Sequence, residues 1–346
     1  MRKYVLEEYV LNEYNASSKA REDVSHFVLQ SGFQSIAKND KRKFRKSKFF
    51  KLLLALAIYG KLFIRLNKND ILFVQTSSKV LEGILKLKKI KNFKIIYLIH
   101  DIFPIRYDDA KAHKHEIDSE IKGLNQCDYI ICHNGKMADR LEELGCTSQL
   151  IPLTIFDYKT EAFIPKDRPL TVPCICFAGN LGKSPFLEKL DLCIDPSLVQ
   201  FHIYGMPKPQ YSNLSYCGSL PPERLPLEIN GSYGLIWEGS YEVWEENNYL
   251  RYNNPHKASL YIAAGLPIIV WSKAAVADFV REHKLGICID SLDELEEKVT
   301  SVRQDEYQMF RANCLKLRPG LIEGIHIKKA LNRILDMEEK RCRASC

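Results

Sequence analysis

The segment most informative about the fold is YNNPHKASLYIAAGLPIIVWS, residues 252–272. Asn254 followed by Pro255 is typical of a helix start, with the amide side chain at the N-cap and proline at the first helical position. Gly265 and Pro267 end that helix sharply, and the apolar run over 266–271 predicts a buried strand. The segment therefore predicts a helix over 254–264 that leads directly into a strand, which is the repeating step of an α/β fold.

The same alternation extends over both halves of the 346-residue chain. In the first half, β-branched or aromatic runs predict strands at 3–10, 70–75, 93–100, 128–133 and 149–153, separated by helical patterns at 19–30, 45–66, 79–90, 115–126 and 136–144. In the second half, strands are predicted at 174–178, 199–204, 234–237, 266–271 and 286–289, with helices at 254–264, 274–282 and 292–303. Strands that alternate with helices in this way predict parallel sheets.

A proline-rich stretch separates the two halves. Residues 157–173 are predicted to be a linker, so we expect two α/β domains, 1–156 and 174–320. A C-terminal helix over 321–346 is expected to pack back on the first domain. Two similar α/β domains are expected to face each other across a cleft at the carboxyl ends of their strands, where ligands bind.

Basic residues are concentrated in the first half. Lys and Arg total 50 against 43 Asp and Glu, but residues 1–155 hold 27 basic and 18 acidic side chains, whereas the rest of the chain holds 23 and 25. This asymmetry suggests an anionic partner for the first domain. The eleven cysteines show no C-x-x-C pair and no regular zinc-site spacing, and the N-terminus lacks a signal-peptide pattern. A reduced, cytoplasmic location is therefore expected.

Ten of the basic residues lie between Lys41 and Lys68, with no acidic residue among them. Apolar side chains recur there at helical spacing, which predicts an apolar stripe flanked by cations. Two interpretations remain open: a helix that lies on anionic lipid at the inner face of the cell membrane, and a helix packed on the sheet with a solvated basic face. The interrupting charges argue against a bilayer-spanning helix, and no nucleic-acid-binding pattern is present.

The segment AGNLGKS, residues 178–184, follows the first predicted strand of the second half. Its small residues would let backbone N–H groups approach a phosphate, whose charge Lys183 would neutralise. The segment is not a P-loop, because Phe177 stands where the Walker pattern requires glycine. The alternative is a simple turn with a solvent-exposed lysine.

His256 and Lys257 follow Pro255 in the first turn of the helix predicted over 254–264. The positive end of a helix, a cation and an imidazole together form an anion site. The alternative is a capped core helix on which these two side chains merely occupy the first turn.

Four segments match a known group of proteins in order and spacing: LIHDIFPIR at 98–106, FAGNL at 177–181, YGLIWEG at 233–239, and YLRYNNPHKASLYIAAGLPIIVWS at 249–272. They make the chain resemble bacterial sugar transferases of the GT-B type. It is most similar to the group that contains β-1,6-galactofuranosyltransferases of O-antigen synthesis and the glucosyltransferases that modify adhesins. The resemblance implies two Rossmann-like domains facing a cleft. The second would hold a UDP-sugar donor and the first a glycan acceptor, including a lipid-linked one. A homo-oligomer is a further expectation.

On this resemblance, the donor diphosphate is expected between the AGNLGKS segment and the start of the helix at 254–264, where departing UDP would be stabilised. The expected donor-binding residues are Ser17, Gly179, Asn180, Lys183, Gly218, Ser219, Glu238, Tyr252, Asn253, Asn254, His256 and Lys257. The UDP-sugar is a substrate, so no cofactor is expected. The lack of a strict D-x-D motif argues against a metal ion.

Three of these assignments have a plainer alternative. Gly218 and Ser219 lie in a segment that this type of fold commonly uses to bind the base, and a plain turn explains them equally well. Glu238 stands where galactofuranosyl members tend to have aspartate, and it would bind sugar hydroxyls or ribose, or cap a neighbouring N–H group. Ser17 lies in the run 15–18 before the first predicted helix, which it would cap if it does not contact the donor.

Catalytic groups are expected directly after the strand predicted at 93–100, at the edge where α/β sheets place them. An inverting transfer needs a base for the acceptor hydroxyl, so Asp101 is the first candidate and Glu116 the second. His100 is expected to assist, or to contact the donor instead.

Two functions from different classes are consistent with these features. The first is an inverting, metal-independent transferase that moves galactofuranose, glucose or galactose from a UDP-sugar to a hydroxyl of a cell-surface glycan precursor or glycoprotein glycan. The second is a catalytically silent glycan- or UDP-binding scaffold with the same fold. Retention of the whole anion site from Lys183 to Lys257 favours the enzyme.

Overall fold

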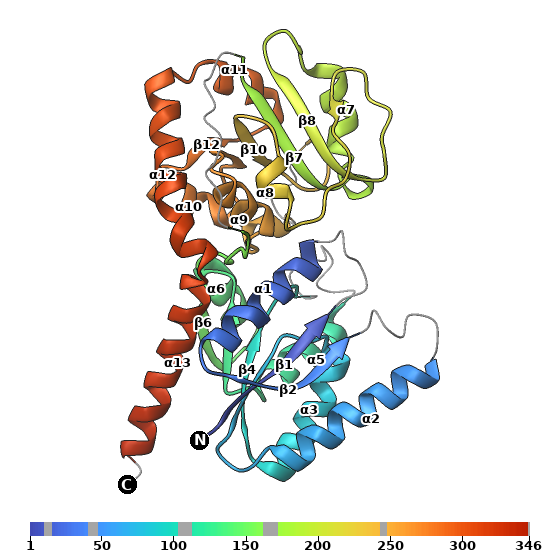
Figure 1. Ribbon diagram of the computed structural model, residues 1–346, viewed down its shortest axis with the longest axis vertical. Coiled ribbons are helices and arrows are strands. Elements are labelled where there is room, and N and C mark those ends of the chain that lie inside the picture. Colours follow the sequence, from blue (N-terminus) through green and yellow to red (C-terminus); the bar gives the residue numbers. More distant parts are fainter. Residues whose placement is uncertain (10–15, 41–47, 103–112, 162–171, 243–247, 345–346) are drawn as a thin grey trace. The chain divides into compact units, whose positions relative to one another are not determined.

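The computed structural model describes residues 1–9, 16–40, 48–102, 113–161, 172–242 and 248–344 (Figure 1). Contacts within the chain divide these residues into two compact units. Within the described ranges, the N-terminal unit comprises residues 1–154, except Ala16, together with 324–344, and the C-terminal unit comprises 155–323. The last helix of the chain therefore belongs to the unit in which the chain begins.

The N-terminal unit contains a parallel sheet with the strand order β2-β1-β3-β4-β5-β6. Its strands are β1 (Lys3–Tyr9), β2 (Gln34–Asp40), β3 (Ile71–Val74), β4 (Lys94–Leu98), β5 (Tyr129–Cys132) and β6 (Gln149–Pro152). Its helices are α1 (Ala16–Gln30), α2 (Lys48–Arg65), α3 (Ser78–Lys91), α5 (Lys114–Leu124), α6 (Gly135–Glu143) and α13 (Ile325–Ala344). The connections run in opposite directions on either side of the β1–β3 pair, so this pair is the switch point at which such sheets bind ligands.

The inner strands are short apolar runs because helices cover both faces of the sheet. Every residue of β3 (ILFV) and β5 (YIIC) is buried, as expected for a parallel sheet covered on both sides. With this strand order, the right-handedness of parallel crossovers places α1 on one face of the sheet and α2, α3, α5 and α6 on the other face.

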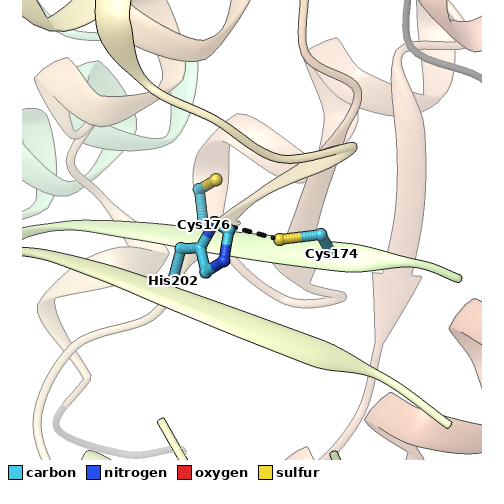
Figure 2. A group of neighbouring side chains, drawn as sticks. All are labelled: Cys174, Cys176 and His202. Atoms are coloured by element: carbon cyan, nitrogen blue, oxygen red, sulfur yellow. Dashed lines mark hydrogen bonds between the residues drawn. The ribbon is translucent and has the colours of Figure 1, made fainter. Parts of the chain in front are cut away.

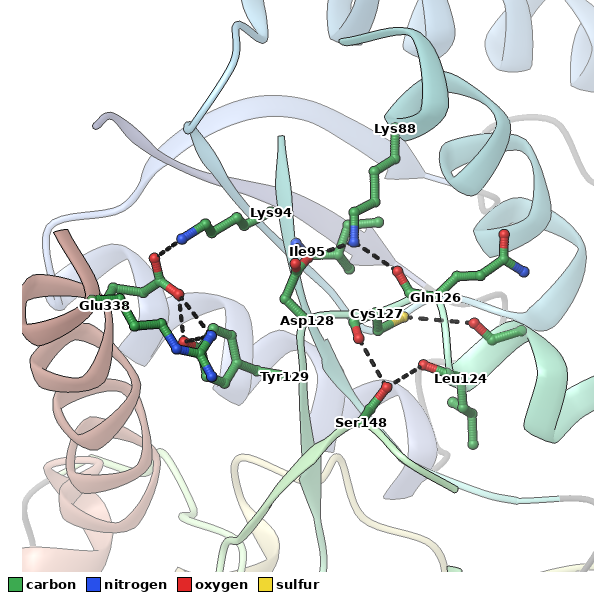
Figure 3. A network of polar contacts seen from close by, with 12 residues as sticks. Lys88, Lys94, Ile95, Leu124, Gln126, Cys127, Asp128, Tyr129, Ser148 and Glu338 are labelled. Atoms are coloured by element: carbon green, nitrogen blue, oxygen red, sulfur yellow. Dashed lines mark hydrogen bonds and ion pairs between the residues drawn. The ribbon is translucent and has the colours of Figure 1, made fainter. Parts of the chain in front are cut away.

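The C-terminal helix α13 packs on the N-terminal unit through a buried carboxylate. Glu338 is fully buried and accepts hydrogen bonds from Lys94 of β4 and Tyr129 of β5 (Figure 3). Burial raises the pKa of Glu338, but the hydrogen bonds from Lys94 and Tyr129 outweigh it and hold the pKa below its ordinary value. Glu338 is therefore ionised at neutral pH and fixes α13 to the sheet.

The C-terminal unit contains a second parallel sheet, with the strand order β12-β11-β10-β7-β8-β9. Its strands are β7 (Cys174–Asn180), β8 (Gln200–Met206), β9 (Ser215–Tyr216), β10 (Tyr233–Ile236), β11 (Ile268–Trp271) and β12 (Gly286–Ile289). Its α-helices are α7 (Phe186–Cys193), α8 (Leu225–Glu228), α9 (His256–Ala263), α10 (Ala275–Glu282), α11 (Leu295–Thr300) and α12 (Gln304–Ile322). This is the strand order of dinucleotide-binding folds, and the switch point lies between β7 and β10.

Several predicted boundaries are wrong. The prediction omits β2, whose sequence QSIAKND is largely polar because it forms an edge strand, and it also omits β9, α7, α8 and α12. The helix predicted over 254–264 begins at His256, since Pro255 has an extended ψ of 135° and takes the N-cap position expected for Asn254. The helix predicted over 19–30 begins at Ala16, so Ser17 lies in its first turn rather than before it.

The apolar stripe predicted within the basic run 41–68 forms α2. Residues 41–47, at the start of that run, lie outside the described residues. No helix in the described part of the chain is long and apolar enough to cross a bilayer.

Candidate active site

The switch point of the C-terminal sheet brings three sequence segments together. β7 ends at Gly179 and Asn180, and Glu238 follows the end of β10 by two residues. α9 begins nearby, with Lys257 in its first turn. A Cβ on Gly179 would lie 3.0 Å from Cε of Lys257. Because Gly179 has no side chain, the Lys257 side chain can lie this close to the backbone of β7.

Lys257 lies between an aromatic face and a carboxylate. Its Nζ is 4.6 Å from the centre of the Phe177 ring and 3.9 Å from Oε1 of Glu238. The lysine side chain is 15% exposed, and the Glu238 side chain is 40% exposed. Burial lowers the pKa of Lys257 below its ordinary value, and the Glu238 carboxylate opposes that shift. A bound anion would relieve the cost of burying this ammonium group.

The residues before α9 are buried and polar. Asn253 is 7% exposed and Asn254 is 3% exposed. Among the described residues, Oδ1 of Asn253 has no hydrogen-bond partner. A buried amide oxygen without a partner is uncommon and needs an explanation, and a ligand that donates a hydrogen bond would supply one.

The His256 side chain makes different contacts from the Lys257 side chain. The ring stacks on Tyr158 with centroids 4.8 Å apart, and its Nε2 is 3.3 Å from the carbonyl oxygen of Asp157. The hydroxyl of Ser259 donates to the carbonyl oxygen of Phe156 at 2.6 Å. His256 and Ser259 thus attach the start of α9 to the segment 156–158.

The other predicted donor residues lie on the same edge of the sheet. Asn180 is exposed, and Lys183 is exposed in the short 3₁₀ helix at Leu181–Lys183. Gly218 follows β9, and its carbonyl accepts from the N–H of Gly205 at 2.9 Å. Gly205 has φ +143°, and a Cβ there would lie 1.9 Å from the carbonyl oxygen of Gly179, so only glycine allows these turns to meet. Ser219 is half-buried after Gly218, and Tyr252 is half-buried beside Arg251.

In the N-terminal unit, the switch point holds a buried carboxylate that the sequence analysis missed. Glu8 of β1 is 1% exposed, and its two carboxylate oxygens accept from Nδ2 of Asn39, each at 3.0 Å. The hydroxyl of Thr76 donates to it at 3.1 Å. A signal was present, since Glu8 is an acid near the end of a strand that was predicted.

The predicted catalytic residues lie at the same edge. Nε2 of His100 is 2.7 Å from Oε1 of Gln75, whose amide nitrogen donates to the backbone of Arg21. Asp101 is exposed, three residues beyond β4. Burial lowers the pKa of Arg21, while the nearby carboxylates of Glu8 and Asp101 oppose that shift. Arg21 is therefore a half-buried cation close to the candidate base.

His100 and Asp101 follow a strand, whereas Glu116 and Ser17 lie in the first turns of helices. Glu116 is exposed in the first turn of α5 and lines a groove of about 640 Å³ between α3 and α5. Ser17 lies in the first turn of α1.

Comparison with known proteins reveals relatives over most of the chain. The model of the glucosyltransferase 3-like N-terminal domain matches residues 2–155, and that of the glucosyltransferase 3-like C-terminal domain matches 175–334. Glucosyltransferase 3 of Streptococcus gordonii is 31% identical over 245 residues, which cover 70% of this chain and 71% of that protein. The β-1,6-galactofuranosyltransferase WbbI of Escherichia coli (strain K12) is 28% identical over 282 residues, or 78% of this chain and 80% of that one.

Solved structures show the same fold at low sequence identity. Sucrose-phosphate synthase of Thermosynechococcus elongatus superposes with a TM-score of 0.69 at 11% identity and covers 98% of this chain and 100% of its own. Alr3699/HepE of Anabaena in complex with UDP gives 0.61 at 11% identity, over 97% of this chain and 100% of its own. The predicted α/β fold of the GT-B type, with two Rossmann-like domains, is confirmed. By its relatives over most of its length, the chain belongs to the glucosyltransferase 3-like family and is a glycosyltransferase.

Proposed function

We propose that this glycosyltransferase moves a hexose from a UDP-sugar to a hydroxyl of a cell-surface glycan precursor or glycoprotein glycan, and that it holds the donor at the carboxyl edge of the C-terminal sheet. The observation that carries the proposal is Lys257, a largely buried cation at the sheet's switch point, next to a glycine and the start of a helix. These features together suit a diphosphate.

The donor site acts on the leaving group. As the bond between the anomeric carbon and the diphosphate oxygen breaks, negative charge grows on UDP. Lys257 and the first N–H groups of α9 are already in place, so they would stabilise this charge without rearranging. Lys183 is exposed on the neighbouring turn and would supply a second cation. With these groups present, the transfer needs no divalent metal at the diphosphate.

The acceptor site supplies the base. In an inverting transfer, Asp101 accepts the proton of the acceptor hydroxyl while the hydroxyl oxygen attacks the anomeric carbon from the face opposite UDP. Burial lowers the pKa of the Arg21 guanidinium group, and the Asp101 carboxylate lies close enough to oppose that shift. His100 is oriented by Gln75 and would contact the donor sugar or phosphate.

The named relatives support the choice of substrates. One is a galactofuranosyltransferase and another a glucosyltransferase, and HepE has been solved with UDP. UDP-galactofuranose and UDP-glucose are therefore the first donors to test, with UDP-galactose as the third.

The test is a screen of UDP-sugars for UDP release that depends on added acceptor. Release with one hexose donor supports the proposal. Tight UDP binding with no release from any donor and acceptor pair would contradict it and would favour a silent scaffold with the same fold.

We further propose that α2 contacts anionic membrane lipid, which would bring the first domain to lipid-linked acceptors. Five apolar side chains of α2 are exposed: Leu52, Leu53, Leu56, Phe63 and Ile64. At 100° per residue they share one face of the helix, flanked by the exposed Lys61. An apolar face with adjacent cations and no acid suits the surface of an anionic bilayer.

A further inference from the structure

A second cluster of reactive side chains lies at the amino-terminal part of the C-terminal sheet. Cys174 and Cys176 are two residues apart on β7, so their side chains point to the same face. His202 of β8 pairs with Cys176 in the register of the two strands. Figure 2 shows the three side chains at neighbouring positions of the two strands, with a hydrogen bond between Cys174 and His202.

Two sulfur atoms, a ring nitrogen and a carbonyl oxygen lie close together in this cluster. Nδ1 of His202 is 3.3 Å from Sγ of Cys174, and the ligand atoms of the three side chains all lie within 4.8 Å of one another. The thiol of Cys176 donates a hydrogen bond to the carbonyl oxygen of Asn230 at 3.0 Å, and Nδ1 of His202 lies 2.6 Å from the same oxygen. A Cβ on Gly231 would lie 2.1 Å from Sγ of Cys176. Glycine at 231 therefore leaves the space that the thiol occupies.

We propose that Cys174, Cys176 and His202 bind one Zn²⁺ ion, with a water molecule as the fourth ligand. Two thiolates and an imidazole nitrogen are the ligands that Zn²⁺ prefers, at bond lengths of about 2.0–2.3 Å, and structural zinc sites are four-coordinate and tetrahedral. Ligand atoms a few ångströms apart need only small movements to reach that geometry. Zinc binding displaces the two thiol protons to solvent.

The proposed ion is distinct from the donor site. Cys174 begins β7 and Gly179 lies five residues further along it, which at the rise of a strand is about 17 Å. Cys174 is 9% exposed and Cys176 is fully buried, whereas His202 is half-buried and reaches the surface. The ion would join β7 to β8, so its role would be to stabilise the C-terminal unit rather than to bind UDP.

A metal-free thiol–imidazole pair is the competing description. The hydrogen bond between Cys174 and His202 accounts for a pKa of His202 above its ordinary value. Such a pair needs only Cys174. In the same description, the Cys176 thiol and the His202 ring hydrogen-bond to the carbonyl oxygen of Asn230. The zinc content of the protein therefore distinguishes the two descriptions.

The test measures zinc in the purified full-length protein, reconstituted with equimolar Zn²⁺ and passed through a desalting column. Elemental analysis should find about one zinc per chain in the wild type. Replacement of either cysteine should weaken zinc binding by more than the roughly 10- to 100-fold that loss of an outer-shell partner costs. The double variant Cys174→Ser/Cys176→Ser should retain almost none. The matched control is Cys193→Ser, which removes an exposed thiol from the same unit and should leave the zinc content unchanged.

A spectroscopic measurement on the wild type keeps the proposal testable if the double variant does not fold. Co²⁺ added to the zinc-free protein should give the visible bands of a tetrahedral site together with sulfur-to-cobalt charge transfer, and Zn²⁺ should abolish both. Zinc should also raise the melting temperature and protect two thiols from modification. The proposal is overturned if the wild type retains no zinc and gives no charge-transfer band, or if the double variant retains as much zinc as Cys193→Ser.

Discussion

Replacement of Lys257 by alanine tests the donor site most directly. The change removes the ammonium group that lies 3.9 Å from Glu238 and against Gly179. A diphosphate charge bound about 4 Å from this ammonium group would interact with it by about 4 kcal/mol at an effective dielectric constant of about 20. Removing one preorganised donor costs about 2.7–4 kcal/mol in known transfer reactions, or about 100- to 1,000-fold in rate. We therefore expect Lys257→Ala to weaken UDP binding and slow transfer by roughly 100-fold or more.

The same change should affect folding far less than binding. Burial lowers the pKa of Lys257, so the charged form is less stable in the folded protein than in water. Below this lowered pKa the ammonium group costs stability, and its removal relieves that cost. Once Lys257 is removed, the lysine charge no longer offsets the Glu238 carboxylate, which would then repel the incoming diphosphate. The double variant Lys257→Ala/Glu238→Gln should consequently regain part of the lost UDP affinity.

The assay combines calorimetry with UDP, transfer kinetics and thermal unfolding. Lys189→Ala is the matched control, because Lys189 belongs to the same unit and forms an exposed ion pair with Glu242 at 2.6 Å. The control should bind UDP as the wild type does. A folded Lys257→Ala variant whose UDP affinity stays within twofold of the control would refute the assignment of Lys257 to the diphosphate.

Four further outcomes are expected. UDP affinity should fall as pH rises through the lowered pKa of Lys257, and Lys257→Arg should remove this decline in a calorimetric pH series; an unchanged decline would implicate another group. Asp101→Asn should reduce kcat by about 100- to 10,000-fold at unchanged UDP affinity, whereas Glu116→Gln should leave kcat nearly unchanged; the reverse result would exchange their roles. Turnover should survive brief EDTA treatment, and a loss restored by Mg²⁺ or Mn²⁺, but not by Zn²⁺, would contradict metal-independent transfer. The wild type should co-sediment with anionic vesicles at low salt and less so as salt rises, and Leu56→Ser/Ile64→Ser should abolish this binding. A wild type that does not bind such vesicles at low salt would show that α2 is simply exposed to solvent.

Local patterns were sufficient to predict the inner strands and the helix that carries Lys257. β3 and β5 are continuous apolar runs, which a sheet covered on both faces requires. The Asn-Pro start and Gly-Leu-Pro end of the helix are also local signals, although the structure begins this helix at His256 rather than at residue 254. β2 lacks any such signal, because an edge strand is half solvated and can be largely polar.

Contacts between distant segments explain what sequence reasoning missed. Glu8 is satisfied by Asn39 and Thr76, which come from two other segments at the same sheet edge, so its burial depends on the strand order and not on its neighbours in sequence. The C-x-C pair on β7 was visible, but its partner His202 lies 26 residues beyond Cys176 and meets it only through the register of β7 and β8. Strand register is set by which face of each strand is buried and by the geometry of the connection between the strands. A single sequence predicts the first of these, and the second emerges only when the unit is folded.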